Sequence, residues 1–190
     1  MIKNKVKEQT ALQKKEKSER ELALAILLEV EKGEKSHLVL RSVLEKYQYL
    51  DKQERAFLTR LTEGTIERTL ELDYIINQYS KTKVQKMKPV IRNILRMAVY
   101  QIKYMDNVPD SAACNEAVKL AGKKGFGTLK GFVNGVLRSI VRSQEQIPYP
   151  DETCPENSLS VKYSMPEWIV TMWLKDYGRE KTEEILKSFY

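Results

Sequence analysis

The stretch Lys130-Gly-Phe-Val-Asn-Gly-Val-Leu-Arg-Ser-Ile-Val-Arg142 decides the fold class of this 190-residue chain. Its apolar residues recur at the i, i+3, i+4, i+7 spacing of a helix with one buried face. A polar, basic edge is formed by four residues at every fourth position: Lys130, Asn134, Arg138 and Arg142. Glycine inside a helix costs about 1 kcal/mol relative to alanine. We therefore expect another helix backbone to approach Gly135 closely, and the segment to be a core helix with a cationic edge.

Composition excludes several classes of protein. The chain is 42% hydrophobic and 31% charged, with two cysteines and one histidine. No apolar run approaches the roughly 18 residues of a membrane span. The cysteines lack CxxC spacing, and a single histidine cannot build a His-rich metal site. We expect a cytoplasmic protein without a metal ion and without a membrane partner.

The charge distribution points to an anionic partner. The net charge is +7, and the segments 81–104 and 119–142 contain lysines and arginines but no acidic residue. After Ser143 the acidic residues outnumber the basic ones. This asymmetry predicts a boundary between two functional units near Ser143.

Helical periodicity and capping signals recur along the whole chain, and no strand-like alternation stands out. Capping-box spacing at Ser18, Asp51 and Ser164 predicts three helix starts. Gly64 is expected to bend or divide the second of these helices, and Gly178 to end the third. The predicted helices cover 18–31, 38–46, 51–79, 89–104, 110–121, 128–142, 164–178 and 179–190. The fold class is therefore all-α.

Three groups of residues are candidates for contact with an anionic partner such as a nucleic acid. A stripe on the helix 89–104 combines bases with an aromatic ring, as stacking plus phosphate contact requires: Arg92, Arg96, Tyr100 and Lys103. The alternative is a solvated helix edge with a tyrosine that lies along it. A glycine-rich loop and the following helix start add Lys123, Lys124 and Lys130, and the helix edge adds Arg138 and Arg142.

No catalytic constellation emerges from the sequence. Gly125, Gly127 and Gly131 imitate a nucleotide-binding pattern, but no strand precedes them. The dipeptide Thr153-Cys154 lies in a proline-rich segment without a histidine or lysine placed to activate the thiol. We predict that Cys154 is inert and that no catalytic or cofactor-binding residue lies in this chain.

Three segments resemble the NusB family, an all-helical RNA-binding fold of two small bundles. They are Asn93-Ile-Leu-Arg-Met-Ala-Val-Tyr-Gln-Ile102, Asn115-Glu-Ala-Val-Lys-Leu-Ala121 and Phe132-Val-Asn-Gly-Val-Leu-Arg138. Tyr163-Ser-Met-Pro-Glu-Trp-Ile-Val170 resembles the connector of the RsmB family, also called Sun or Fmu. These bacterial enzymes use S-adenosylmethionine to methylate a cytosine C5 of small-subunit (16S) ribosomal RNA.

The resemblance implies a division of the chain and a function. The expected parts are a basic N-terminal arm (1–17), a NusB-like RNA-binding domain (18–143), a linker (144–157) and the start of a connector to a methyltransferase domain absent from this chain (158–190). The arm is either a frayed tail or a second contact with nucleic acid. We expect an RNA-binding, substrate-positioning region that is inactive alone, with S-adenosylmethionine bound elsewhere in the parent enzyme. The alternatives are a stand-alone antitermination factor and a purely structural brace.

Overall fold

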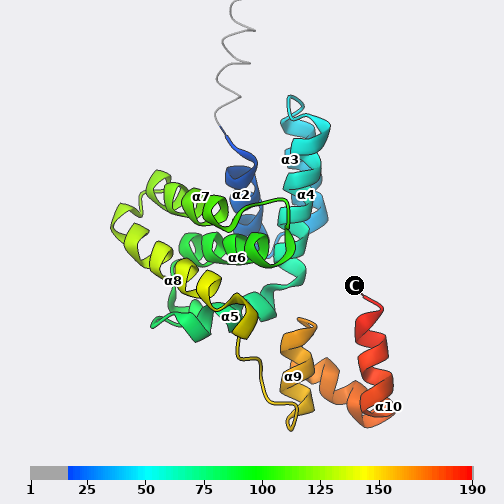
Figure 1. Cartoon of the computed structure of the whole chain (residues 1–190). Helices are drawn as coiled ribbons and strands as arrows, with labels where there is room; N and C mark the ends of the chain where they lie inside the picture. Colours follow the sequence, from blue (N-terminus) through cyan, green and yellow to red (C-terminus); the bar gives the residue numbers. More distant parts are fainter. Residues whose placement is uncertain (1–16, 190) are drawn as a thin grey trace, which may run out of the picture. The chain divides into compact units, whose positions relative to one another are not determined.

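The computed structural model describes residues 17–189, which form helices and loops without a β-strand and so confirm the all-α prediction (Figure 1). The predicted arm lies outside the described residues except for Lys17. The α-helices are α2 (Glu19–Glu31), α3 (Ser36–Lys46), α4 (Lys52–Glu67), α5 (Thr69–Tyr79), α6 (Pro89–Tyr104), α7 (Asp110–Lys123), α8 (Lys130–Arg142), α9 (Pro155–Lys162) and α10 (Glu167–Lys187). Short 3₁₀ turns cover Val84–Lys86, Gly127–Leu129 and Gln144–Gln146.

The chain divides into two compact units between Ile66 and Glu67. This boundary differs in place from the one predicted near Ser143, which stays a prediction about function. Helix α9 begins at Pro155, inside the predicted linker 144–157. No helix within residues 17–189 combines the length and the apolar character that a bilayer crossing needs.

The first unit contains α2, α3 and the greater part of α4. The capping box of α2 is confirmed, because the Glu21 amide donates to Ser18 Oγ at 3.4 Å and the Ser18 amide donates back to the Glu21 carboxylate at 3.2 Å. Asp51 and Glu54 make the same reciprocal pair, both at 2.8 Å. These caps satisfy amides that a helix start leaves without partners. Apolar side chains form the core of this unit: Leu22, Leu24, Ile26, Leu58 and Leu61 are all buried.

The second unit begins with the bundle of α5, α6, α7 and α8. Pro89 occupies the first turn of α6, where its missing N–H costs nothing, and the predicted bounds of this helix are confirmed. Helices α5, α7 and α8 all contact α6, whose apolar face is buried among them (Figure 1). Small residues on α7 permit this packing, since Ala113, Ala117 and Ala121 are buried. The result is a bundle built around α6.

Helices α9 and α10 form a second, smaller core in the same unit. Leu159, Tyr163, Val170 and Leu186 are its buried residues. The helix predicted to end at Gly178 does end there, because Gly178 has the non-helical angles φ 73° and ψ 173°. A second helical stretch follows directly, and α10 is therefore two helices joined by a kink at Gly178. Hydrogen bonds from Lys162 and then Tyr163 lower the pKa of Glu183 to about 2. We call residues 155–187 the connector.

Two local expectations are wrong. Helix α4 does not break at Gly64; the interruption is at Arg68, whose ψ of 13° separates α4 from α5. Gly135 does not lie against another backbone, because a Cβ added there meets no heavy atom within 4 Å, and the residue is exposed. Packing therefore does not explain why a glycine stands at position 135 of this helix.

Replacing Gly135 with alanine should raise the free energy of unfolding by about 0.5–1 kcal/mol, because alanine loses less backbone entropy in a helix. Thermal or urea unfolding followed by circular dichroism measures this change. Gly125→Ala is the matched control, since Gly125 has φ +85° and should be destabilised by any side chain. A loss of stability in Gly135→Ala would show that the site is not open.

Candidate nucleic-acid interface

The stripe predicted on α6 does not face solvent. Arg96 donates from Nε and Nη2 to the two carboxylate oxygens of Asp73 on α5, both at 2.7 Å. The two side chains are only 13% and 15% exposed. This bidentate pair fixes α6 against α5 and uses the Nε–Nη2 edge of the guanidinium, which is the edge that a phosphate would need.

The other members of the stripe are buried or half-buried. Tyr100 is 8% exposed and its ring lies 5.3 Å from that of Tyr104, so it cannot present a free face to a base. Lys103 Nζ lies 3.0 Å from the Glu71 carboxylate, and Arg92 is half-buried. The prediction that this stripe is exposed to solvent is therefore wrong. Periodicity cannot show that α5 covers that face of α6. The RNA-binding role of these four residues stays a prediction.

The corner between α7 and α8 does present its bases to solvent. Lys123 and Lys124 end α7, and Lys130 is the first residue of α8; all three are exposed. Gly125 turns the chain between the helices with φ +85°. Gly122 makes room for the Lys130 side chain, since a Cβ added there would lie 2.2 Å from Lys130 Cε.

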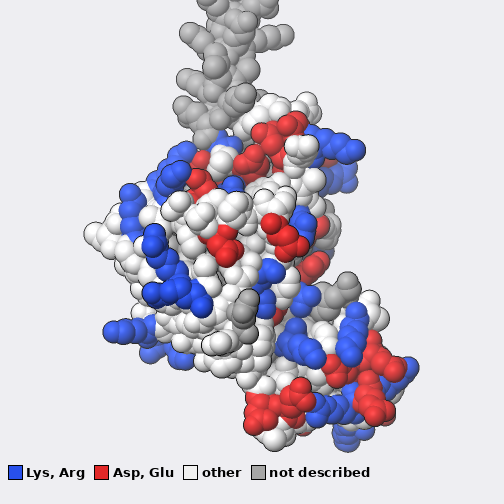
Figure 2. Space-filling model, in the orientation of Figure 1, with Lys and Arg blue, Asp and Glu red and all other residues white. Residues whose placement is uncertain are grey.

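The polar edge of α8 continues this surface. Arg138 and Arg142 are exposed and donate to uncharged side chains of their own helix. Arg138 Nε donates to Asn134 Oδ1 at 3.1 Å, and Arg142 Nη2 donates to Ser139 Oγ at 3.4 Å. No acidic residue occurs between Lys119 and Arg142. Figure 2 shows lysine and arginine side chains gathered over α8. We define the α7–α8 basic surface as Lys123, Lys124, Lys130, Arg138 and Arg142.

The two cysteines differ in their surroundings. Burial raises the pKa of the Cys114 thiol, and Cys154 is exposed before the start of α9. Within residues 17–189 no group of three or more His, Cys, Asp or Glu side chains is placed to hold a metal ion. The inertness of Cys154 stays a prediction.

Sequence reasoning missed three residues that the structure brings together: Glu71, Tyr149 and Ser164. Glu71 is 3% exposed and lies among apolar residues of α5. Tyr149 donates to it from the segment before α9, and Ser164 accepts from the α5 backbone. A carboxylate in an apolar run was the available signal for Glu71, whereas the contacts of Tyr149 and Ser164 span more than 70 residues and leave no local trace.

The bundle and its basic surface define an all-helical domain with a cluster of exposed cations on two of its helices. The chain belongs to the NusB family, whose family model matches residues 17–142. The chain is 39% identical over 175 residues to the probable ribosomal RNA small subunit methyltransferase B of Bacillus subtilis (strain 168). The alignment covers 91% of this chain and 38% of that protein. It thus spans less than half of this longer relative.

Two further comparisons concern proteins of NusB size. The transcription antitermination protein NusB of Desulforamulus reducens is 33% identical over 131 residues, covering 67% of this chain and 90% of that protein. A crystal structure of antitermination factors NusB and NusE in complex with dsRNA has a TM-score of 0.60 and 23% identity, covering 66% of this chain and 94% of that chain. The structural likeness shows the fold alone.

Proposed function

We propose that this chain is the RNA-binding, substrate-positioning N-terminal region of a small-subunit rRNA cytosine-C5 methyltransferase that acts in the cytoplasm. The observation that carries the proposal is the extent of the match. The family match ends at residue 142, whereas an alignment of 175 residues with the methyltransferase must extend beyond it, into the connector. A relative of NusB size covers only 67% of the chain.

The methyl donor would be bound outside these residues. Nucleotide-like cofactors of open α/β sheets bind in a crevice at the carboxyl ends of parallel strands. Residues 17–189 contain no strand and so do not form such a crevice. We assign these helices no catalytic step, and their proposed task is to hold ribosomal RNA for the rest of the enzyme.

The α7–α8 basic surface is the proposed RNA contact. Its lysines and arginines would neutralise phosphates and release condensed counterions, which makes affinity salt-dependent. Phosphate contacts set register and orientation and carry little sequence information. A positioning region with this surface should therefore bind structured RNA with modest sequence preference.

Replacing Lys123, Lys124 and Lys130 together with glutamine should weaken binding to a small-subunit rRNA fragment about 10–100-fold at low salt. Each lost phosphate contact lowers the slope of log affinity against log salt by about 0.7–0.9, so the slope should fall by about 2–3. Fluorescence anisotropy across a salt series measures both quantities.

A matched control removes the same charge elsewhere. Lys175, Lys181 and Lys187 are exposed on α10, and their replacement with glutamine should leave the slope nearly unchanged. Equal losses in the two triple variants would mean that net charge, and not this surface, determines binding. Salt-insensitive binding by the unmodified chain would favour the structural brace.

The second candidate function is antitermination, favoured by the 33% identity to a NusB protein. It differs in the RNA preferred and in the need for a second protein. Competition between small-subunit rRNA and the double-stranded RNA of the NusB–NusE complex, with and without NusE, separates the two. Tighter binding to that double-stranded RNA in the presence of NusE would favour antitermination.

A further inference from the structure

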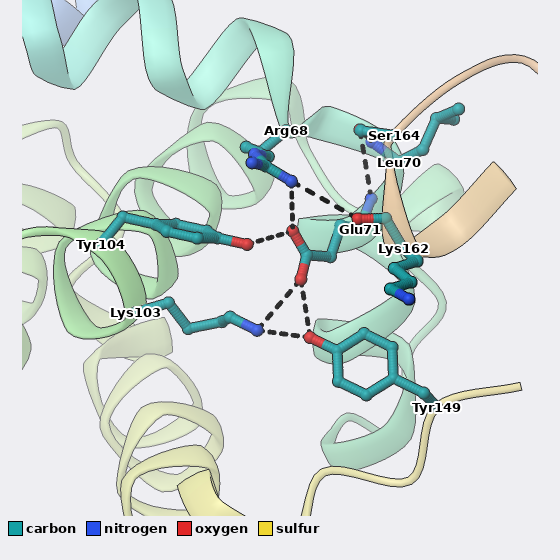
Figure 3. A network of polar contacts seen from close by, with 8 residues as sticks. All are labelled: Arg68, Leu70, Glu71, Lys103, Tyr104, Tyr149, Lys162 and Ser164. Atoms are coloured by element: carbon teal, nitrogen blue, oxygen red, sulfur yellow. Dashed lines mark hydrogen bonds and ion pairs between the residues drawn. The ribbon is translucent and has the colours of Figure 1, made fainter. Parts of the chain in front are cut away.

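Glu71 is a buried carboxylate that joins four parts of the second unit (Figure 3). It lies in the first turn of α5 and is 3% exposed. Lys103 Nζ lies 3.0 Å from Oε1, and Arg68 Nη1 lies 3.7 Å from Oε2. The three side chains are between 4% and 18% exposed, so this is a largely desolvated cluster of one acid and two bases.

Two tyrosines complete the coordination of this carboxylate. Tyr149 donates its hydroxyl to Oε1 at 2.6 Å, and Tyr104 donates its hydroxyl to Oε2. The Glu71 carboxylate thus accepts hydrogen bonds from Lys103, Tyr149 and Tyr104, and its ion pair with Arg68 completes a polar hub. Burial and then the hydrogen bond to Glu71 raise the pKa of Tyr149, which keeps it a donor.

Tyr149 brings the segment before α9 to this hub. Its ring stacks on Tyr74 of α5 with centroids 6.2 Å apart, and Lys103 Nζ lies 5.0 Å from its centroid. Tyr74 in turn donates its hydroxyl to the Pro148 carbonyl at 2.8 Å. The segment predicted as a linker is thus fixed to the bundle by the stacked ring of Tyr149 and by the hydrogen bonds of its hydroxyl.

Ser164 brings the connector to the same helix start. The Leu70 and Glu71 amides of α5 donate to Ser164 Oγ at 2.9 and 3.4 Å. Arg68, the N-cap residue of α5, makes no side-chain cap, so a serine more than 90 residues away supplies it. The predicted capping box of α10 is wrong for this reason. Ser164 has φ 48°, a conformation that non-glycine residues adopt at a cost.

We infer that Glu71 is a positioning residue, which with Tyr149 and Ser164 locks the connector to the bundle in a single orientation. The connector has its own small core, so its internal packing does not set that orientation. The polar contacts at the α5 start do so, aided by Arg68 donating to the Lys162 carbonyl at 3.4 Å. The significance of the lock rests on the proposed function: RNA held on α7 and α8 would keep a fixed position relative to the end of the connector.

The test measures the distance between bundle and connector in the whole chain without RNA. Exposed Cys154 is first replaced with serine, and spin labels are then attached at Thr128→Cys and Lys175→Cys, both exposed positions. Pulsed electron paramagnetic resonance measures the distance between the two labels. The unmodified lock should give one narrow distance distribution. In Glu71→Gln the single narrow peak should be replaced by a broad distribution of distances. In Tyr149→Phe, which removes only one hydroxyl, the peak should become broader.

A coupled pair and a control sharpen the outcome. The effect of Tyr149→Phe should shrink in a Glu71→Gln background, since both remove the same contact. Glu116→Gln makes the same chemical change at an exposed ion pair on α7 and should leave the distribution narrow. If Glu71→Gln and Tyr149→Phe both keep the narrow peak, even with a lowered melting temperature, Glu71 stabilises without positioning. Failure of RNA binding in the anisotropy assay would overturn the proposed function and leave these distances unaffected.

Discussion

Replacing Arg96 with methionine should lower the free energy of unfolding by about 3–5 kcal/mol, because it leaves the Asp73 carboxylate without its partner in a largely desolvated position. Both N–H···O contacts are 2.7 Å long, so the pair is well formed and its loss is felt in full. Urea unfolding followed by circular dichroism measures the change. In conditions where the variant remains folded, its RNA affinity should match that of the parent chain.

The double variant Asp73→Leu/Arg96→Met is the control for this interpretation. A buried ion pair replaced as a whole by apolar residues often costs little, so the double variant should recover most of the lost stability. A variant that keeps its stability but loses RNA affinity would place Arg96 on the RNA after all. That result would restore the interpretation of α6 as a stacking and phosphate surface.

The contrast between α6 and α8 shows how far the sequence could carry the prediction. Both helices have an apolar face and a basic stripe, and the bounds of α6 were predicted from Pro89 onward. Periodicity identifies the polar side of a helix, but it does not say whether another helix covers that side. Asp73 lies 23 residues before Arg96, and only the packing of α5 brings it into reach.

Capping signals show a similar limit. Ser18 with Glu21 and Asp51 with Glu54 cap their own helices, as their spacing predicted. Ser164 has the same spacing before Glu167, yet its hydroxyl caps α5. A local motif predicts a local partner, and a tertiary contact can outweigh it when another helix start lacks a cap. The contacts that Tyr149 and Ser164 add to the hub around Glu71 could not be predicted from the sequence for that reason.

Replacing Leu137 with alanine should lower the free energy of unfolding by about 2–5 kcal/mol, the cost of lost transfer energy plus a residual cavity. Leu137 is fully buried on the face of α8 that packs in the bundle, whereas Arg138 next to it is exposed. Denaturant unfolding measures the loss, and Gly135→Ala in the same helix should shift stability in the opposite direction.

If α8 has a packing face and a separate RNA-binding face, as proposed, Leu137→Ala should also leave RNA binding unchanged. Leu137→Ala changes neither the charge nor the position of the exposed edge while the bundle stays folded. Its salt slope for RNA binding should therefore equal that of the parent chain at temperatures below unfolding, and binding should be lost only together with helicity. An altered slope in a folded variant would mean that the cavity moves Arg138 and that core and surface of α8 are not independent. An unchanged slope, beside the lowered slope of the triple lysine variant, would assign stability to one face of α8 and RNA contact to the basic surface that α8 shares with the end of α7.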